Sequence, residues 1–330
     1  MNNNEKKRNK IQEIEKKLVL TQNDYTNIKD KMKEYYGEYV NDDNELYNDY
    51  NLLKNKINKN HRLNKSVSSG PRNIIKFKQD IYKKELRKII DFLLINLESF
   101  PDFESIILFV AKRRRIIELL KLNLDKYLLF GEFRGTIKYS SKYNIFSPII
   151  NSKGDHLINN IISDFGKNKC VYKNNKLTYI RNIHRKGNVK HLSWKHTRPQ
   201  LILKLFNEMN EIYEEFIESI SNINNKETSK NLLSKLYWLY MQACPFLRGS
   251  ASIGEIVFSA LLQKHFDCDF RLFKKRFSPK LIPDIHALTY PLEHFQSIFW
   301  SQLVSCEQYK NNFNRNSNWN NYMNKRGPDF

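Results

Sequence analysis

The sequence lacks the features that mark membrane proteins, disulfide scaffolds and fibrous proteins. No run of about 18 apolar residues is present, and the first ten residues contain no apolar stretch of the kind found in secretory signals. With 10 glycines and 9 prolines among 330 residues, the chain is not collagen-like. The cysteines form no CxxC pair, so we expect reduced thiols rather than a zinc ribbon or a disulfide framework: Cys170, Cys244, Cys268 and Cys306. We therefore expect a soluble protein that is cytoplasmic, or that is secreted into a host or competitor cell without a cleavable signal.

The short motifs of the common nucleotide-binding and hydrolytic enzymes are missing as well. The sequence contains no GxxxxGK[ST], GxGxxG, HExxH or GxSxG pattern. His184, His191 and His196 lie close together in sequence, but their spacing fits no zinc pattern, so no metal site is predicted. An activity of this protein must therefore be sought outside these classes.

What the chain does contain is material for a large core and an uneven excess of positive charge. Hydrophobic residues make up 40% of the sequence and aromatic residues 13%, which suffices for one large domain or two to three smaller ones. The formal net charge is +21, and residues 71–200, with 27 basic and 11 acidic residues, carry +16 of it. Nucleic acid, an anionic membrane surface or an acidic protein would be attracted there. The alternative is a Lys- and Asn-rich composition typical of AT-rich genomes, with no functional meaning.

Apolar spacing predicts a mainly α fold, with a helical-bundle core, a few short β-hairpins and an N-terminal helical arm. The first ten residues of the arm are expected to be disordered. The helical part that follows is expected to break near residues 41–44. The chain divides into a charged arm, a linker, a helical subdomain, a helical core with β-hairpins and a loose tail: 1–65, 66–71, 72–126, 127–306 and 307–330.

Within these segments, three- and four-residue spacing predicts several helices: 74–97, 103–124, 199–221, 228–243, 251–265 and 288–303. The helix at 251–265 is apolar nearly all round, so it is expected at the centre of the bundle. Two hairpins are predicted, with turns at residues 173–176 and 187–188. The basic run at residues 112–115 is interpreted as a solvated collar, because four adjacent helical residues cannot share one face.

One connection between helices has a composition suited to chemistry. Residues 244–255 read Cys-Pro-Phe-Leu-Arg-Gly-Ser-Ala-Ser-Ile-Gly-Glu and lead into the predicted central helix. Small residues at a helix N-terminus leave backbone N–H groups available to an anion, and the helix dipole favours negative charge there. Arg248 and Gly249, with the hydroxyls of Ser250 and Ser252, therefore form a candidate phosphate site. The alternative is an ordinary helix connection in which Ser250 is a cap.

The same residues resemble the Fic family, whose motif is His-Pro-Phe-x-Asp/Glu-Gly-Asn-Gly-Arg-x-x-Arg. Pro245, Phe246 and Gly249 match it in register, whereas Cys244 replaces the catalytic His and Arg248 replaces the acidic metal ligand. The resemblance spans about residues 180–270. It implies a degenerate Fic-like effector or toxin that binds a nucleotide and transfers part of it to a protein hydroxyl, or a pseudoenzyme of that fold. Because Arg248 cannot hold Mg²⁺, no metal is required in this interpretation.

Candidate catalytic residues follow from this interpretation. Cys244 is a nucleophile if the helix terminus lowers the pKa of its thiol, and otherwise a small core residue. Asp284 and His286 follow the central helix closely enough to act as general acid or base. The alternative role of both is to cap the helix predicted at 288–303.

Two other functions remain open. The basic region 71–200 predicts a nucleic-acid-binding protein in which Trp194 stacks on a base, or on a nucleotide ring in the enzyme interpretation. The N-terminal arm predicts a protein-interaction module, in which residues 5–65 dock on a partner.

Overall fold

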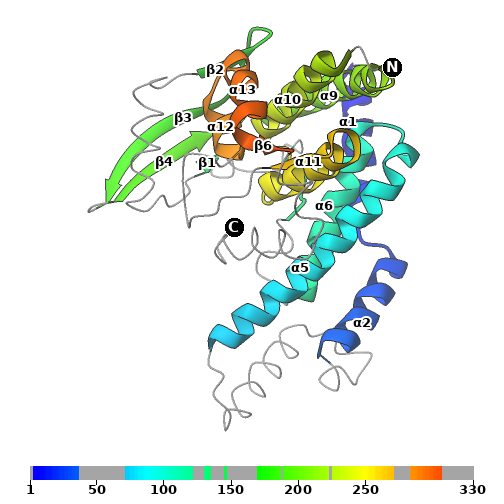
Figure 1. Cartoon of the computed structure of the whole chain (residues 1–330). Coiled ribbons are helices and arrows are strands. Elements are labelled where there is room, and N and C mark those ends of the chain that lie inside the picture. The colour runs from blue at the N-terminus through cyan, green and yellow to red at the C-terminus, as the bar shows by residue number, and fades with distance from the viewer. Residues whose placement is uncertain are drawn as a thin grey trace.

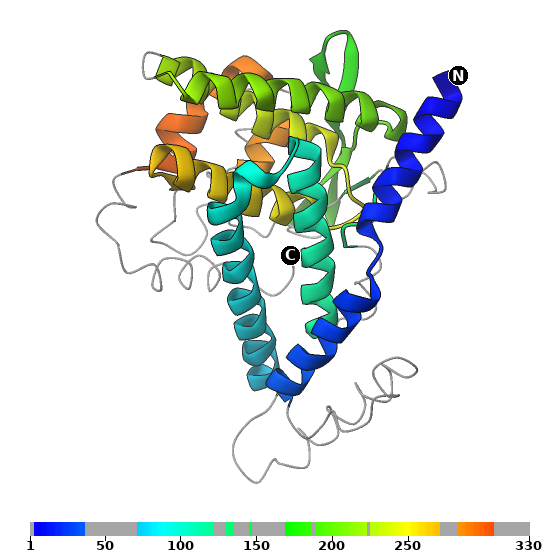
Figure 2. The same ribbon diagram turned by 90° about the vertical axis from the view of Figure 1, so that its right-hand side faces the viewer.

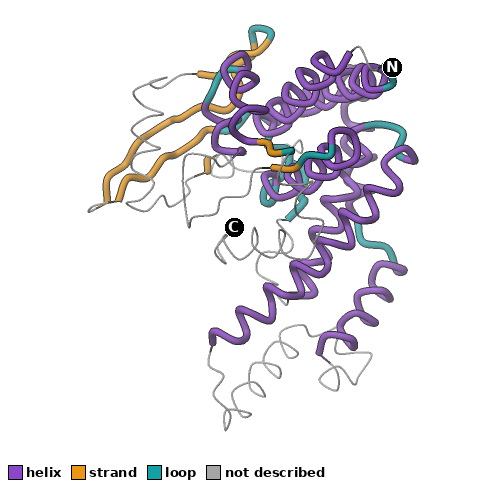
Figure 3. The backbone as a smooth tube through the Cα atoms, in the orientation of Figure 1, coloured by secondary structure: helices purple, strands orange, loops and turns teal. Residues whose placement is uncertain are grey.

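Helices dominate the structure, which confirms the predicted fold class. A computed structural model describes residues 3–36, 71–121, 130–134, 145–146, 169–186, 189–222, 225–270 and 283–306. The helices form one body and a small antiparallel sheet extends from its side (Figures 1 and 3). None of the helices in these ranges has the length and apolar character needed to cross a membrane.

The centre of the body is built from the three helices that the apolar spacing predicts best. They are α9 (Pro199–Ile220), α10 (Lys226–Ala243) and α11 (Ser250–Phe266). Pro199 begins α9, where its fixed φ and missing N–H carry no penalty. Residues of α11 are buried on every side, including Ile253, Val257 and Phe258. Since α11 packs against α10 and also against α5 (Pro71–Asn96) and α6 (Phe103–Leu120), it lies at the centre as predicted.

Two further helices, α5 (Pro71–Asn96) and α6 (Phe103–Leu120), form a hairpin that packs on α11. A short 3-10 turn, η2 (Leu97–Ser99), leads into the loop between them. Asp102 caps α6 by accepting a hydrogen bond from the backbone N–H of Ser105 at 2.7 Å. The predicted linker ends differently from our expectation, because Pro71 is already the first residue of α5.

The N-terminal arm is two helices, α1 (Asn3–Leu18) and α2 (Gln22–Tyr36), which lie along α6 and α5 (Figure 2). The first ten residues are therefore helical from Asn3, not disordered as expected. A break occurs at Val19–Thr21, where Asp24 accepts a hydrogen bond from the backbone N–H of Thr21 at 2.7 Å. The break predicted at 41–44 lies outside the described residues. Because the arm buries Ile14, Leu18, Ile28 and Met32 against the body, it is part of the packed structure.

Both predicted hairpins are present in a four-stranded sheet with the order β1-β4-β3-β2. Its strands are β1 (Ile145–Phe146), β2 (Lys169–Tyr172), β3 (Asn175–Lys186) and β4 (Val189–Lys195). The β2–β3 turn places Lys173 and Asn174 at φ 45° and 63°, as a two-residue hairpin turn requires.

The C-terminal part of the described chain departs from the predicted single helix at 288–303. The structure has α12 (Pro283–Thr289), α13 (Leu292–Ile298) and a π-helical turn, η7 (Phe299–Leu303). The chain breaks at Tyr290 and Pro291, because the residue before a proline is disfavoured in helical geometry. Pro291 is the N-cap of α13, with φ −62° and ψ 159°, so the new helix begins at Leu292.

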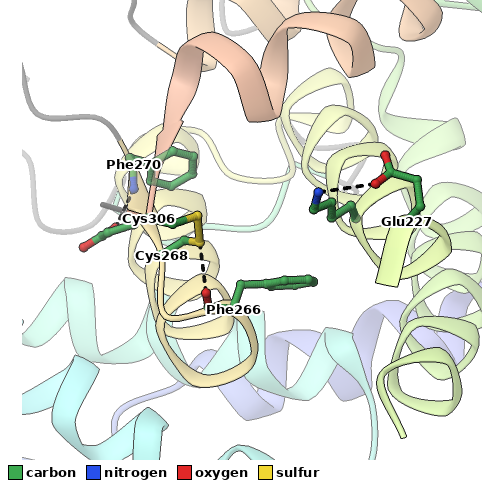
Figure 4. Close-up of a disulfide and its surroundings, with 7 residues drawn as sticks. Glu227, Phe266, Cys268, Phe270 and Cys306 are labelled. Carbon is green, nitrogen blue, oxygen red and sulfur yellow. Dashed lines mark hydrogen bonds and ion pairs between the residues drawn. A yellow bond between two sulfur atoms is a disulfide. The ribbon is translucent and has the colours of Figure 1, made fainter. Parts of the chain in front are cut away.

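A disulfide joins Cys268 to Cys306, which corrects the expectation that all four cysteines are reduced (Figure 4). The two residues lie 38 positions apart in sequence, and strands β5 (Asp269–Phe270) and β6 (Val304–Ser305) bring them together. Cys170 and Cys244 are free and buried, as expected for reduced thiols. Sequence spacing gave no signal for the bridge, because the pairing depends on a contact between distant segments.

Candidate functional site

The connection between α10 and α11 runs alongside residues 130–134 and is hydrogen-bonded to them. The backbone N–H of Arg134 donates to Pro245 O at 2.7 Å, and that of Leu247 donates to Glu132 O at 2.9 Å. A third bond runs from Gly131 N to Arg248 O at 3.2 Å. These bonds fix the backbone of the connection, so the side chains at the start of α11 are held by a firm support.

Gly249 is required at the point where the connection turns into α11. Its φ is +87°, a conformation that side-chain-bearing residues rarely adopt. A Cβ atom there would lie 2.7 Å from Cδ1 of Phe130. Gly249 also accepts a hydrogen bond from Ile253 N at 2.9 Å, the first full turn of the helix. The glycine of the predicted phosphate site is therefore explained by backbone conformation and packing alone.

Arg248 lies half-buried beside the start of α11, with its guanidinium carbon 5.5 Å from the centroid of the Phe130 ring. The same ring receives a second guanidinium, that of Arg114, at 4.7 Å. A cation over an aromatic face is attracted to the ring's negative quadrupole. Phe130 therefore orients Arg248 near the N-terminus of α11, where the structure keeps a positive group next to the positive end of the helix dipole.

The two serines of the predicted site differ in how far their hydroxyls are already engaged. Ser250 is buried. Its Oγ accepts a hydrogen bond from the backbone N–H of Phe246 at 3.0 Å and donates one to Phe246 O at 3.2 Å. It is the first residue of α11 rather than its N-cap, a position that Gly249 holds. Ser252 is half-buried and donates to Gly249 O at 3.1 Å. Ser250 thus stabilises the turn, and Ser252 is the more accessible hydroxyl.

Arg134, which sequence analysis did not single out, closes the C-terminal end of α10. It is 2% exposed, and its Nη1 donates to Cys244 O at 2.6 Å and to Ala243 O at 3.3 Å. Its Nη2 donates to Thr197 O at 2.9 Å. A cation at a helix C-terminus is favourable because the last carbonyls carry partial negative charge. Burial lowers the pKa of Arg134 from its usual value, and the guanidinium is positioned by carbonyl oxygens.

Gln242 joins the sheet to the helices below this point. Its Oε1 accepts from Thr178 N at 3.0 Å and its Nε2 donates to Ala287 O at 2.7 Å. The backbone oxygen of Gln242 accepts from the hydroxyls of Thr178 and Thr197, at 2.8 and 2.6 Å. Since Gln242 is fully buried, these bonds satisfy its polar atoms inside the protein and fix β3 and α12 against α10.

Cys244 occupies the left-handed position at the C-terminal end of α10, with φ 41°. Burial raises the pKa of its thiol to about 12, with Asp284 adding to the increase and Arg134 opposing it. A thiol with this pKa is protonated at neutral pH, and the thiolate is the nucleophilic form. The condition set for a nucleophilic Cys244, a lowered pKa, is therefore not met, because burial has the larger effect and raises the pKa.

Asp284 and His286 are both in α12 and both buried. Asp284 lies close enough to Cys244 to influence its pKa, so the structure does bring these two candidates together. The ring of His286 lies 5.1 Å from that of Tyr290, and its carbonyl oxygen accepts from Tyr290 N at 2.9 Å. The alternative cap role at a helix 288–303 is not realised, because that helix is divided.

Trp194, the last of the predicted binding residues, lies on β4. Its backbone pairs with Ile180 of β3 and Phe146 of β1. Its side chain lies outside the described residues, so its predicted stacking on a base or nucleotide ring stays a prediction. In the part of the chain that the structure describes, no group of three or more His, Cys, Asp or Glu side chains is arranged to hold a metal ion.

The basic run on α6 does not form the predicted solvated collar. Arg114 is 2% exposed and its Nη1 lies 2.6 Å from Glu118 Oε1. Lys112 pairs with Asp24 at 2.6 Å and Arg115 with Glu132 at 3.0 Å. The guanidinium of Arg113 lies 5.3 Å from the centroid of the Phe109 ring. Because these cations contact carboxylates and rings of the protein itself, they contribute little to an external positive field.

A comparison with known protein families gave a match that includes the connection between α10 and α11. A family model described as AvrB_AvrC, avirulence protein, matches residues 160–307, from before β2 to just past β6. This is less than half of the chain, so the match describes what the C-terminal region is similar to. A search of curated proteins gave no match. The expected Fic family is therefore corrected, because the family that matches is a different one; an effector character, which was also expected, is supported.

Proposed function

We propose that the protein is a bacterial effector that is delivered into a host cell and acts there on a host protein. The observation that carries this proposal is the match of residues 160–307 to the avirulence protein family. The matched region contains the sheet, α9–α13 and the whole connection between α10 and α11. We therefore assign the effector activity to this region, and assign to α1, α2, α5 and α6 the role of a packed support. The packing of α1 and α2 on the body gives no support to a free docking arm.

Delivery is tested with a fusion of the chain to a reporter enzyme that is active only in host cytoplasm. Host cells exposed to bacteria that produce the fusion are expected to show the reporter signal. The same reporter fused to an unrelated cytosolic protein of the bacterium is the control. A signal no higher than that control would contradict the effector role.

We further propose that the effector binds a phosphate-bearing small molecule at the start of α11. Three features support it: the half-buried cation of Arg248, its contact with the Phe130 ring, and the N-terminal end of a 17-residue helix. Arg248 supplies a charge-assisted contact to a phosphate oxygen, and Ser252 supplies a hydroxyl one turn along. No chemical step is assigned to Cys244, because its thiol is buried and protonated at neutral pH. Binding or sensing is therefore the role we assign to this site.

Thermal-shift measurements with ATP, GTP, CTP, UTP and NAD, each with and without Mg²⁺, test this site. A ligand at 100 times its Kd stabilises the folded state by about 2.7 kcal/mol. We expect one ligand to raise the melting temperature independently of Mg²⁺, and Arg248→Ala to abolish the increase. Lys204→Ala is the matched control, because Lys204 is an exposed cation on α9. An equal shift in wild type and Arg248→Ala would contradict the site.

A further inference from the structure

Strands β3 and β4 continue beyond the rest of their sheet as a two-stranded ribbon that extends from the helical body (Figure 1). β2 pairs with β3 only from Asn175 to Tyr179, and β1 pairs with β4 only at Trp194 and Lys195. Among the described residues, 181–186 and 189–193 therefore pair with no strand outside these two stretches. We call these two stretches the distal ribbon. A two-stranded ribbon is marginally stable by itself, and its outer edges carry backbone donors and acceptors that have no strand partner among the described residues.

The distal ribbon is basic and contains no acidic residue. Its charged residues are Arg181, Arg185, Lys186 and Lys190. The strand register sets Arg185 directly opposite Lys190, and sets His184 directly opposite His191. Like charges at directly opposed positions destabilise an antiparallel pair. The sequence therefore concentrates positive charge where it opposes formation of the ribbon.

Most of the basic residues of α6, by contrast, are paired with carboxylates. On α6, Lys112, Arg114 and Arg115 each pair with a carboxylate within 3.0 Å. The distal ribbon has no carboxylate in its own sequence that could do the same across the strands. An acidic partner molecule would supply the negative charge that the ribbon's own sequence lacks.

We propose that the distal ribbon is a docking surface for an acidic, extended segment of a host protein, which adds to the ribbon as a further strand. This inference rests on the proposed effector function, because it names the chemistry of the host target. The backbone of the segment pairs with an outer edge of the ribbon, and its Asp or Glu side chains pair with the cations. Alternation of acidic and β-branched residues is the sequence pattern that this geometry selects in the target.

A polypeptide fits this surface better than a nucleic acid does. A strand edge presents N–H donors and C=O acceptors in alternation, and a second strand satisfies both. A phosphodiester backbone offers only acceptors, so it would leave the carbonyl groups of the edge without partners. Nucleic acid remains a measurable outcome of the test, since it too is attracted by four cations.

The test uses the full-length protein and a fluorescein-labelled 12-residue peptide of alternating Glu and Val, measured by fluorescence anisotropy at 50 mM NaCl. We expect the double variant Arg185→Glu/Lys190→Glu to bind about tenfold more weakly or worse, as for the loss of charge-assisted bonds. The control is Lys33→Glu/Lys204→Glu, which changes the net charge equally at two exposed helical positions. It should bind within about twofold of wild type. Circular dichroism of both double variants shows whether each is folded.

A second peptide separates strand addition from simple charge attraction. It has the same sequence with N-methyl groups at alternate amides, which remove the donors of one strand edge. We expect about tenfold weaker binding of this peptide than of the unmodified one. Equal binding of the two peptides would overturn the strand-addition proposal. So would tighter binding of a 12-nucleotide single-stranded DNA, or no binding of the peptide. Any of these outcomes can occur while the reporter signal and the Arg248-dependent thermal shift persist, so failure here is distinguishable from failure of the proposed function.

Discussion

The basic run of α6 and the basic distal ribbon each contain four cations but differ in the carboxylates that their own surroundings or sequence supply. On α6, four consecutive cations lie against the carboxylates of Asp24, Glu118 and Glu132 and against aromatic rings. On the ribbon, four cations occupy two short strands without an acidic residue. In the first region the positive charge stabilises the fold, and in the second it opposes the strand pairing. Net charge per region therefore does not show whether the cations of that region have carboxylate partners within the protein.

The comparison also changes the meaning of the +16 carried by residues 71–200. α5 and α6 together hold 11 basic and 5 acidic residues, a net of +6, and several of these cations form ion pairs within the protein. Four further cations lie on the ribbon, whose own sequence contains no acidic residue and which is inside the region that matches the avirulence family. The proposed acidic partner and the proposed effector function therefore involve the same region of the chain.

The substitution expected to have the largest effect on stability is Arg114→Ala. Arg114 and Glu118 are 2% and 1% exposed, so removing the guanidinium leaves a buried carboxylate without its main partner. We expect unfolding in urea to show a loss of about 3–5 kcal/mol. Arg185→Ala on the ribbon should change the stability by less than about 0.5 kcal/mol, or increase it. Equal losses in the two variants would show that the ribbon cations are compensated as those of α6 are.

A double variant distinguishes the charge of this pair from its packing. Arg114→Met with Glu118→Leu replaces both charges by apolar groups of comparable length. Replacement of a complete buried ion pair is often neutral, so we expect most of the stability lost in Arg114→Ala to return. A double variant as unstable as the single one would instead assign the effect to the contacts of Arg114 with the rings of Tyr82 and Phe130.

The contacts of Arg114 illustrate which features of the fold can be predicted from the sequence and which cannot. Periodicity predicts α6 and correctly states that four adjacent bases cannot share one face. It does not say which base meets Tyr82, 32 positions earlier, or Phe130, 16 positions later. The interpretation as a solvated collar fails for this reason: burial of a cation is decided by residues that are close only after folding.

The candidate site repeats this pattern. The connection between α10 and α11, its glycine and the burial of α11 follow from local composition, and all are predicted. The roles of Arg134 and of the Cys268–Cys306 bridge depend on long-range contacts and are missed. The break at Tyr290 is different, because Pro291 was visible in the sequence and the predicted helix ran through it. That error was avoidable, whereas the other two had no sequence signal.

A smaller effect is expected from the titration of Asp269, a half-buried acid on β5. Burial raises the pKa of Asp269 to about 6, although hydrogen bonds from Ser259, Phe270 N and Gln263 oppose the increase. Because the folded state then holds its proton more tightly than the unfolded chain, this group's contribution to stability falls as the pH rises from about 4 to about 6. The loss is about 1–3 kcal/mol and is complete above that range.

The variant Asp269→Asn isolates this contribution. Subtracting its free energy of unfolding from that of wild type at each pH removes the effects of other titrating groups. We expect the difference to favour wild type near pH 4 and to decline toward pH 6. A flat difference would mean that folding does not raise the pKa of Asp269.

The smallest expected effect sharpens the comparison most directly. Arg185→Glu converts the like-charged pair Arg185–Lys190 into an opposite-charged one at the same register position. We expect the free energy of unfolding to increase by about 0.2–1 kcal/mol, since cross-strand pairs contribute by this amount and their sign follows the charges. The same variant should weaken binding of the acidic peptide, because one of the cations it contacts is reversed. A stabilised ribbon that binds less well would show that the positive charge is kept at a cost to folding. A ribbon that loses stability would show that Arg185 is already neutralised within the protein, and the distinction from α6 would then disappear.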